Sequence, residues 1–196
     1  MRAARRFLLA LKERERLEDV ASLTVELYGS LALTGKGHAT DLALLLGLEG
    51  ETPDGVDPDS VSLRIRAIEN KKQISLFGKY PIHFDPSTDL LFLKKKRLLF
   101  HSNALRFKAF DQKKKLILSQ VYYSIGGGFV VDHAEAMEKS VVKAIRGVPF
   151  PFRTAEELME HCRREKKAIW EIVYENEKAL HSEEHLRTGI AKIWKA

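Results

Sequence analysis

Residues 22–48, SLTVELYGSLALTGKGHATDLALLLGL, contain a strand pattern, a glycine-bearing turn and a helix pattern in one short stretch. Apolar and polar residues alternate over 22–28, which predicts a half-buried strand. Three glycines within 29–37 predict a turn. Residues 40–48 are apolar on nearly every side of a helix, which predicts a short and well-buried helix. A strand that runs directly into a buried helix favours an α+β fold.

The sequence on either side extends this pattern to a mixed sheet with flanking helices. Residues 3–17 carry a broad apolar stripe at helical spacing, and a second amphipathic helix begins at Pro58. Residues 73–131 are mostly strand-like, and their clearest element is a hairpin of 105–110 and 116–123. Breaks are expected at Gly78, Pro81 and the turn 85–87.

The chain from Pro149 onward has the composition of helices. Thr154 and Glu157 have the spacing of a capping box, and two further amphipathic helices are expected after it. We therefore expect an α+β domain over 1–148 and a helical extension over 149–196.

The single cysteine, Cys162, excludes several kinds of site within this chain. One thiol cannot form an intrachain disulfide, a four-cysteine zinc site or the ligand set of an iron–sulfur cluster. Any such cluster would have to come from another chain, and no metal site is expected in this one.

Charge and hydropathy indicate which classes of molecule the chain could bind. Lys and Arg number 33 and Asp and Glu 27, a net charge of +6 that permits an anionic partner without requiring one. The basic runs 94–97 and 113–115 lack interleaved aromatic residues, so we interpret them as solvated and expect no nucleic acid. No apolar run approaches the roughly 20 residues that cross a bilayer, and the acidic N-terminal helix is unlike a transit peptide. We expect a soluble cytoplasmic protein that does not bind membranes.

The first candidate site is the segment TGKGHATD, residues 34–41. Its glycines could leave backbone amides pointing outward at a helix N-terminus, with Lys36 as the counter-charge for a carboxylate or phosphate. It is not a P-loop, because Lys36 is followed by Gly37 rather than Ser or Thr. The alternative is an ordinary strand-to-helix turn in which the glycines only set the backbone angles.

Two further segments could contribute chemistry. His101 and Asn103, at the start of the hairpin, offer a general base and an amide that can hydrogen-bond an amino acid. Ser124 and the three glycines 126–128 combine a hydroxyl with a backbone that another group can approach closely. Considered locally, the alternatives are a simple turn and a bulge.

The whole pattern resembles a known enzyme family. The segments TVELYGSLALTGKGHATDLALLLGL, ETPDGVDPDSV, HSNALRF and YYSIGGGFVVD resemble, in order and spacing, the β portion of bacterial iron–sulfur-dependent L-serine dehydratases (L-serine ammonia-lyases). The likeness continues through FPFRTAEEL and NEKALHSEE to Trp194 and covers nearly the whole chain.

The resemblance implies both a fold and a reaction. The β domain of this family is an α+β domain similar to the allosteric substrate-binding domain of phosphoglycerate dehydrogenase. A following helical α domain binds a 4Fe–4S cluster, whose open iron acts as a Lewis acid on the serine hydroxyl while a base removes the α proton. The products are pyruvate and ammonia, which places the family in amino-acid catabolism and gluconeogenesis.

The resemblance also carries site roles to positions of this chain. The resemblance implies that His38 or His101 transfers the proton. It also implies that Asn103 and the backbone amides after Thr34 bind the carboxylate or the amino group of the substrate. The expected substrate-binding residues are Thr34, Gly35, Lys36, Gly37, Asn103 and Ser124.

The chain also departs from the family pattern. Ala39 stands where the family has Gly, and Ser102 and Ala104 stand where it has Pro and Gly. The family's upstream serine-rich loop and its cluster-bearing domain are absent from this sequence. We therefore expect a β portion that is inactive alone, that forms a homo-oligomer, and that handles L-serine only with an α domain or α chain. The alternative is a stand-alone regulatory module that binds an amino acid without catalysis.

Overall fold

The computed structural model describes residues 1–137 and 147–195 and divides the chain into two compact units, Met1–Met137 and Glu138–Ala196. The boundary predicted after residue 148 stays a prediction, and residues 138–146 before it lie outside the described residues. No helix among the described residues is long and apolar enough to cross a membrane.

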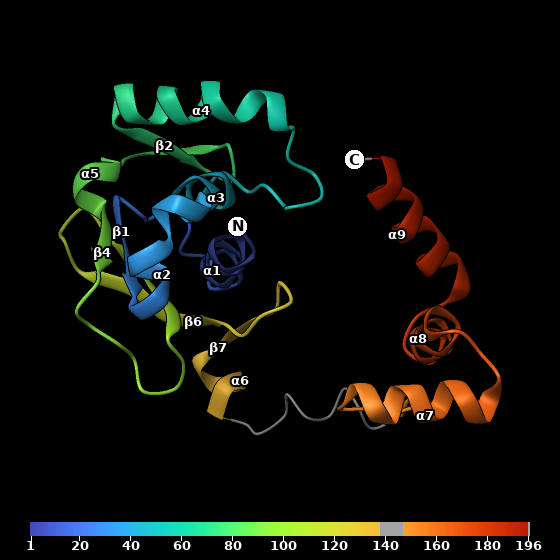
Figure 1. Ribbon diagram of the computed structural model, residues 1–196. Helices are drawn as coiled ribbons and strands as arrows, with labels where there is room; N and C mark the ends of the chain where they lie inside the picture. The colour runs from blue at the N-terminus through green and yellow to red at the C-terminus, as the bar shows by residue number, and fades with distance from the viewer. Residues whose placement is uncertain (138–146, 196) are drawn as a thin grey trace. The chain divides into compact units, whose positions relative to one another are not determined.

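The larger unit is built on a five-stranded mixed sheet with the strand order β4-β1-β5-β6-β7 (Figure 1). β1 pairs in parallel with β4, and the remaining pairs are antiparallel. The strands are β1 (Ser22–Tyr28), β4 (Leu90–Leu93), β5 (Asn103–Phe110), β6 (Leu116–Ser124) and β7 (Val130–Asp132). The predicted α+β class, the strand over 22–28 and the long hairpin are confirmed.

One face of this sheet is covered by α1 and α3. Alternation along β1 and β5 directs Leu27 and Phe107 to this face, where the ring of Phe7 from α1 stacks on Phe107 with centroids 5.1 Å apart. α3 contacts both α1 and α4, and Figure 1 shows α1 nearly end-on beside α3. The two helices are α1 (Arg2–Glu13) and α3 (Thr40–Leu48). α4 (Pro58–Lys71) and a small hairpin of β2 (Gln73–Leu76) and β3 (Tyr80–His83) pack on α3.

The opposite face carries a buried charge. Glu26 of β1 accepts hydrogen bonds from the Lys108 ammonium at 2.7 Å and the Tyr28 hydroxyl at 2.6 Å, and Arg106 lies 3.7 Å away. Burial would raise the pKa of Glu26, but these hydrogen bonds and the two cations outweigh it and lower that pKa. Burial, with the hydrogen bond to Glu26, raises the pKa of Tyr28 to about 12.

Local predictions failed at two places. Residues 29–37 are not a plain turn, because Gly29–Thr34 forms the helix α2 and Lys36–His38 a single 3-10 turn, η1. Pro81 does not break a strand but lies inside β3, opposite Ser75 in a two-stranded sheet where a missing N–H is tolerated.

The three glycines 126–128 form the turn between β6 and β7. Their φ angles are +96°, +57° and +75°, a left-handed region that glycine enters without steric cost. A Cβ at Gly126 would meet nothing within 4 Å, so conformation and not close approach requires glycine there. At Gly128 the carbonyl accepts a 2.7 Å hydrogen bond from the Arg2 guanidinium, which ties this turn to α1.

The smaller unit contains α7 (Ala155–Glu165), α8 (Ile169–Lys178) and α9 (Glu183–Lys195). The predicted capping box is present, because the Thr154 hydroxyl and the Glu157 carboxylate each accept from the other's backbone N–H. Asn176 of α8 exchanges two hydrogen bonds with the backbone of Phe150, at 2.7 and 2.9 Å. These contacts fasten the segment before α7 to α8.

We expect Glu26→Gln to lower the free energy of unfolding by about 1–3 kcal/mol at neutral pH, because Lys108 loses a charge-assisted hydrogen bond. The folded pKa of Glu26 lies below its ordinary value of 4.5, so its stabilisation is complete above pH 4.5 and is lost as the pH falls through the folded pKa. The difference between variant and wild type should therefore shrink in acid.

Urea unfolding at pH 7 and at pH 3 measures both effects. Glu69→Gln, at an exposed position on α4, is the matched control and should change stability at neither pH. A destabilisation by Glu26→Gln that persists unchanged in acid would contradict the assigned charge network.

Candidate functional site

The candidate residues gather at one end of the five-stranded sheet. β1, β4 and β6 end there and β5 begins there, since Tyr28 is paired with both Leu93 and Ala104, and Ala104 with Tyr123. Asn103 opens β5 and Ser124 closes β6 at this end. Segments that lie far apart in the sequence are thus brought to one edge.

α2 is attached to the 101–103 turn by its backbone. The Ser30 N–H donates to the Ser102 carbonyl at 3.0 Å, and Gly29 forms an isolated bridge with Asn103. Gly29 has a φ of +51°, and a Cβ there would lie 2.3 Å from the Ser102 carbonyl oxygen. Only glycine fits where the start of α2 passes the 101–103 turn. Sequence reasoning did not single out Gly29, although a glycine directly after a predicted strand was the available signal.

The His101 side chain closes its own turn. Its Nδ1 accepts a hydrogen bond from the Asn103 backbone N–H at 3.0 Å. A ring nitrogen that accepts carries no proton, so the neutral imidazole carries its proton on Nε2. Neutral His101 is therefore able to donate a hydrogen bond from Nε2. His101 and Asn103 are both half-buried.

Part of the backbone in the segment after α2 is hydrogen-bonded internally. The N–H groups of His38 and Thr40 donate to the Gly35 carbonyl at 3.2 and 2.8 Å, and the Ala39 N–H donates to the Lys36 carbonyl at 3.3 Å. The amides of His38, Ala39 and Thr40 therefore do not point outward as expected, because the tight 3-10 turn uses them internally. The side chains of Lys36 and His38 are exposed.

Lys36 lies against the end of β4. Its ammonium is 5.4 Å from the centre of the Phe92 ring, a cation–π contact, and it lines a hollow of about 640 Å³ with Asp41 and Asp85. Lys72 donates to Asp85 at 2.7 Å and, with the bonds from Ser87, holds the pKa of Asp85 well below its usual value. Of the predicted site residues, Lys36 alone lines this hollow.

The remaining predicted positions differ in their surroundings. Gly35 is buried, and a Cβ there would lie 3.2 Å from the Phe92 ring. Gly37 is exposed and open, since a Cβ would meet nothing within 4 Å. Thr34 ends α2, where its hydroxyl donates to the Ser30 carbonyl at 3.0 Å. Ser124 is half-buried and paired with Val130.

The metal-binding capacity of the chain is small. Within residues 1–137 and 147–195, no three His, Cys, Asp or Glu side chains are grouped so that they could hold a metal ion. Cys162 is buried on α7 and is the only cysteine in the sequence. The residues present do not fit an iron–sulfur cluster, which needs several thiolates.

Comparison with known proteins decides the family. A family model described as the serine dehydratase beta chain matches residues 1–135, which include every residue of the sheet end described above. This chain belongs to the serine dehydratase β-chain family. The predicted resemblance is confirmed, whereas the likeness to a phosphoglycerate dehydrogenase domain stays a prediction.

Curated relatives of this β-chain family member are similar over its whole length. They include L-serine dehydratase of Streptomyces coelicolor, 40% identical over 195 residues, and L-serine dehydratase 2 of Escherichia coli, 37% identical over 197 residues. The L-serine dehydratase of Haemophilus influenzae is 35% identical over 201 residues. These alignments cover 99–100% of this chain but only 42–43% of each relative. The chain therefore spans about two-fifths of the length of the relatives it matches.

Substitution by alanine should affect the stability of the β chain at one glycine and not at another. Gly29→Ala should lower the free energy of unfolding by about 1–3 kcal/mol, because it adds backbone strain and a contact with Ser102. Gly37→Ala should stay within about 1 kcal/mol of wild type, since the added methyl group has open space. Thermal and urea unfolding compare the two, and equal stabilities would contradict the described crossing of α2 and the 101–103 turn.

Ala39 of the β chain is held in the left-handed region with a φ of +53°, which is costly for any residue with a Cβ. We expect Ala39→Gly to raise the free energy of unfolding by about 0.5–1 kcal/mol, the relief of strain being partly offset by a more flexible unfolded chain. Ala43→Gly, inside α3, is the control and should be destabilising. A loss of stability in Ala39→Gly would show that the conformation at residue 39 is not strained.

Proposed function

We propose that this chain is the β portion of an L-serine dehydratase and that it positions L-serine at the end of the sheet. The observation that carries the proposal is the β-chain match over 1–135, because it covers the segments 34–38 and 101–103 together with Ser124. The names of the full-length relatives support L-serine as the substrate.

The polar groups at this end suit the two charged groups of an amino acid. The Lys36 ammonium can attract the carboxylate, and the His101 Nε2–H can donate to one of its oxygens. The Asn103 side-chain carbonyl can accept from the ammonium group. The N–H groups of His38, Ala39 and Thr40 are used in internal bonds, so Lys36 and His101 are the proposed partners of the carboxylate.

The two histidines then have different tasks. The Nδ1 of His101 is engaged by the Asn103 N–H, so the neutral ring has no free nitrogen to take a proton, and His101 acts as a hydrogen-bond donor. His38 is exposed on η1, and its role is to remove the proton from the α carbon.

The reaction balances without an oxidant or a reductant. Loss of the α proton and of the β hydroxyl removes one water from L-serine and gives an aminoacrylate. This species tautomerises to an imine, and hydrolysis by one water releases pyruvate and ammonia. The resemblance assigns departure of the hydroxyl to an iron–sulfur cluster, for which this chain offers no ligands, so the chain alone should be inactive.

We expect the purified chain to form no pyruvate from L-serine. Co-expression with the part of a full-length relative that lies beyond the aligned region, followed by anaerobic reconstitution with iron and sulfide, should produce pyruvate. In that complex His38→Gln should lower kcat at least about 100-fold with little change in KM, as loss of a general base does. Asn103→Ala should instead mainly raise KM.

The control is His83→Gln, because His83 is exposed on β3 in the small hairpin, away from the five-stranded sheet. It should leave kcat and KM unchanged. Pyruvate formation by the chain alone would overturn the need for a partner. Calorimetric binding of L-serine to the chain, combined with an inactive reconstituted complex, would support the alternative of an amino-acid-binding regulatory module.

A further inference from the structure

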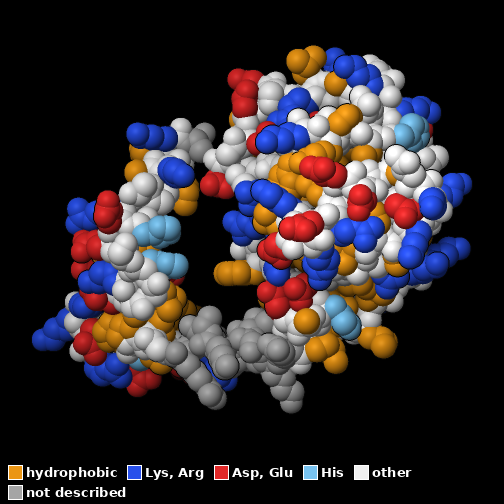
Figure 2. Space-filling view, turned by 180° about the vertical axis from the view of Figure 1, so that it is seen from behind, with side chains coloured by type: hydrophobic (Ala, Val, Ile, Leu, Met, Phe, Trp, Pro, Cys, Tyr) orange, Lys and Arg blue, Asp and Glu red, His pale blue; other side chains and the backbone are white. Residues whose placement is uncertain are grey.

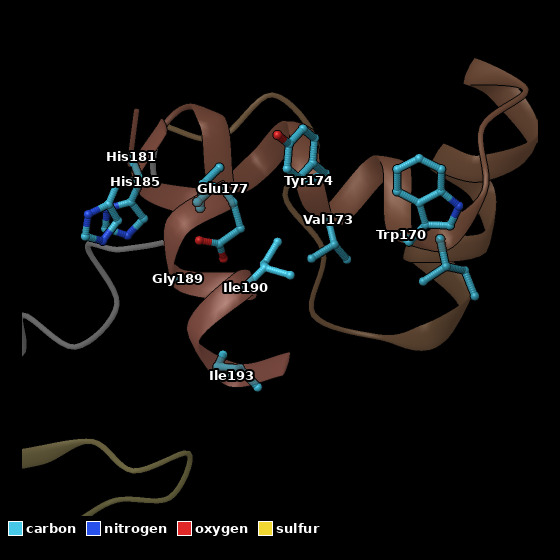
Figure 3. Close-up of a pocket in the computed structure, with 11 residues that line it drawn as sticks. Trp170, Val173, Tyr174, Glu177, His181, His185, Gly189, Ile190 and Ile193 are labelled. Atoms are coloured by element: carbon cyan, nitrogen blue, oxygen red, sulfur yellow. The ribbon is translucent and has the colours of Figure 1, made fainter. Parts of the chain in front are cut away.

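The smaller unit contains an apolar groove between α8 and α9. It has a volume of about 860 Å³, and Figure 3 shows the side chains that line it, which include Trp170, Val173 and Tyr174 of α8 and Ile190 and Ile193 of α9. These positions recur at spacings of three or four residues, so each helix presents one apolar stripe to the groove.

The side chains of this groove are exposed to an extent that is unusual for their size. Trp170 is 68% exposed, Ile190 58% and Ile193 79%. Among the described residues of this unit the buried hydrophobic side chains are Cys162 and Ile172, which form a very small core. Figure 2 shows hydrophobic side chains at the surface of this unit, close to pale-blue histidines. A contiguous apolar surface of this kind marks an interaction site.

One end of the groove is polar. Glu177, His181 and His185 line it there, and the two histidine rings are stacked with centroids 5.2 Å apart. α8 is seen end-on in Figure 1 and α9 along its length, so the two apolar stripes meet where the helices cross. A crossing of this kind with a polar end suits an amphipathic helix whose apolar face enters the groove and whose cation lies near Glu177.

The sequence comparisons indicate where that helix comes from. The full-length relatives align with 99–100% of this chain, including α8 and α9, although the chain accounts for only about 42–43% of their length. The two helices therefore belong to a fold that continues in the remaining three-fifths of a serine dehydratase. An apolar groove left open at this point of a shared fold is the place where the remainder should pack.

We infer that the α8–α9 groove binds an amphipathic helix from the part of a serine dehydratase that lies beyond the region shared with this chain. The identity of this occupant rests on the proposed function. The groove itself and its exposure do not depend on it.

The test uses the whole chain, co-expressed with a tagged polypeptide that comprises the Streptomyces coelicolor L-serine dehydratase outside the 195 aligned residues. The wild-type chain should co-purify with it. Ile190→Glu should reduce the amount recovered at least tenfold, because it places a charge in the groove beside Glu177. Thr188→Glu adds the same charge on α9 at an exposed residue that does not line the groove, and should stay within twofold of wild type.

Circular dichroism of the two purified variants should match the wild type, because neither residue is buried. Equal recovery of Ile190→Glu and wild type, or no recovery of the wild-type complex, would overturn the inference. A dimer of the chain alone that Ile190→Glu dissociates in sedimentation would also overturn it, because a second copy would then fill the groove. A complex that forms through the groove but yields no pyruvate would instead count against the proposed function alone.

Discussion

β1 is hydrogen-bonded along both of its edges, to β4 on one side and to β5 on the other. Every strand of the larger sheet is therefore placed, directly or through β5, by this one segment. The apolar side chains of β1 also form part of the layer on which α1 and α3 pack. The hydrophobic contribution of that layer depends on β1 holding its position, since each side chain must meet the helices above it.

The same strand connects the core to the functional end of the sheet. α2 leaves β1 at Gly29 and passes so close to Ser102 that no side chain can intervene. The 101–103 turn and the η1 turn are thus both tied to the end of a buried strand. The backbone of both turns is thereby fixed relative to the sheet.

Local pattern predicted much of this architecture. Alternation fixed the strand at 22–28 and the hairpin, and the Thr154 and Glu157 spacing correctly indicated the start of α7, because these signals act between near neighbours. α2 was missed because its support comes from Ser102, some seventy residues away. The internal bonds of the His38, Ala39 and Thr40 amides and the tautomer of His101 also depend on three-dimensional geometry. Family resemblance selected the site residues, but strand order, which is non-local, brings them to one edge.

The two units of the chain differ in the groups that they leave accessible. Asn103 and Ser124 lie at one end of the five-stranded sheet, and the sequence has a single thiol. The described residues of the smaller unit have only a small buried core and expose tryptophan and isoleucine side chains. Both observations support the proposal that this chain is one part of a larger enzyme.

The buried carboxylate of Glu26 has a consequence for how β1 finds its place. Neighbouring side chains of a strand point to opposite faces, so a slip of one residue would move Glu26 into the layer of Leu and Phe side chains. It would also separate Glu26 from Lys108 and leave both charges without a partner. The same slip would move Leu23 and Leu27 out of the core. The acidic residue and the leucines of β1 therefore penalise the same shifted pairing from opposite faces of the sheet.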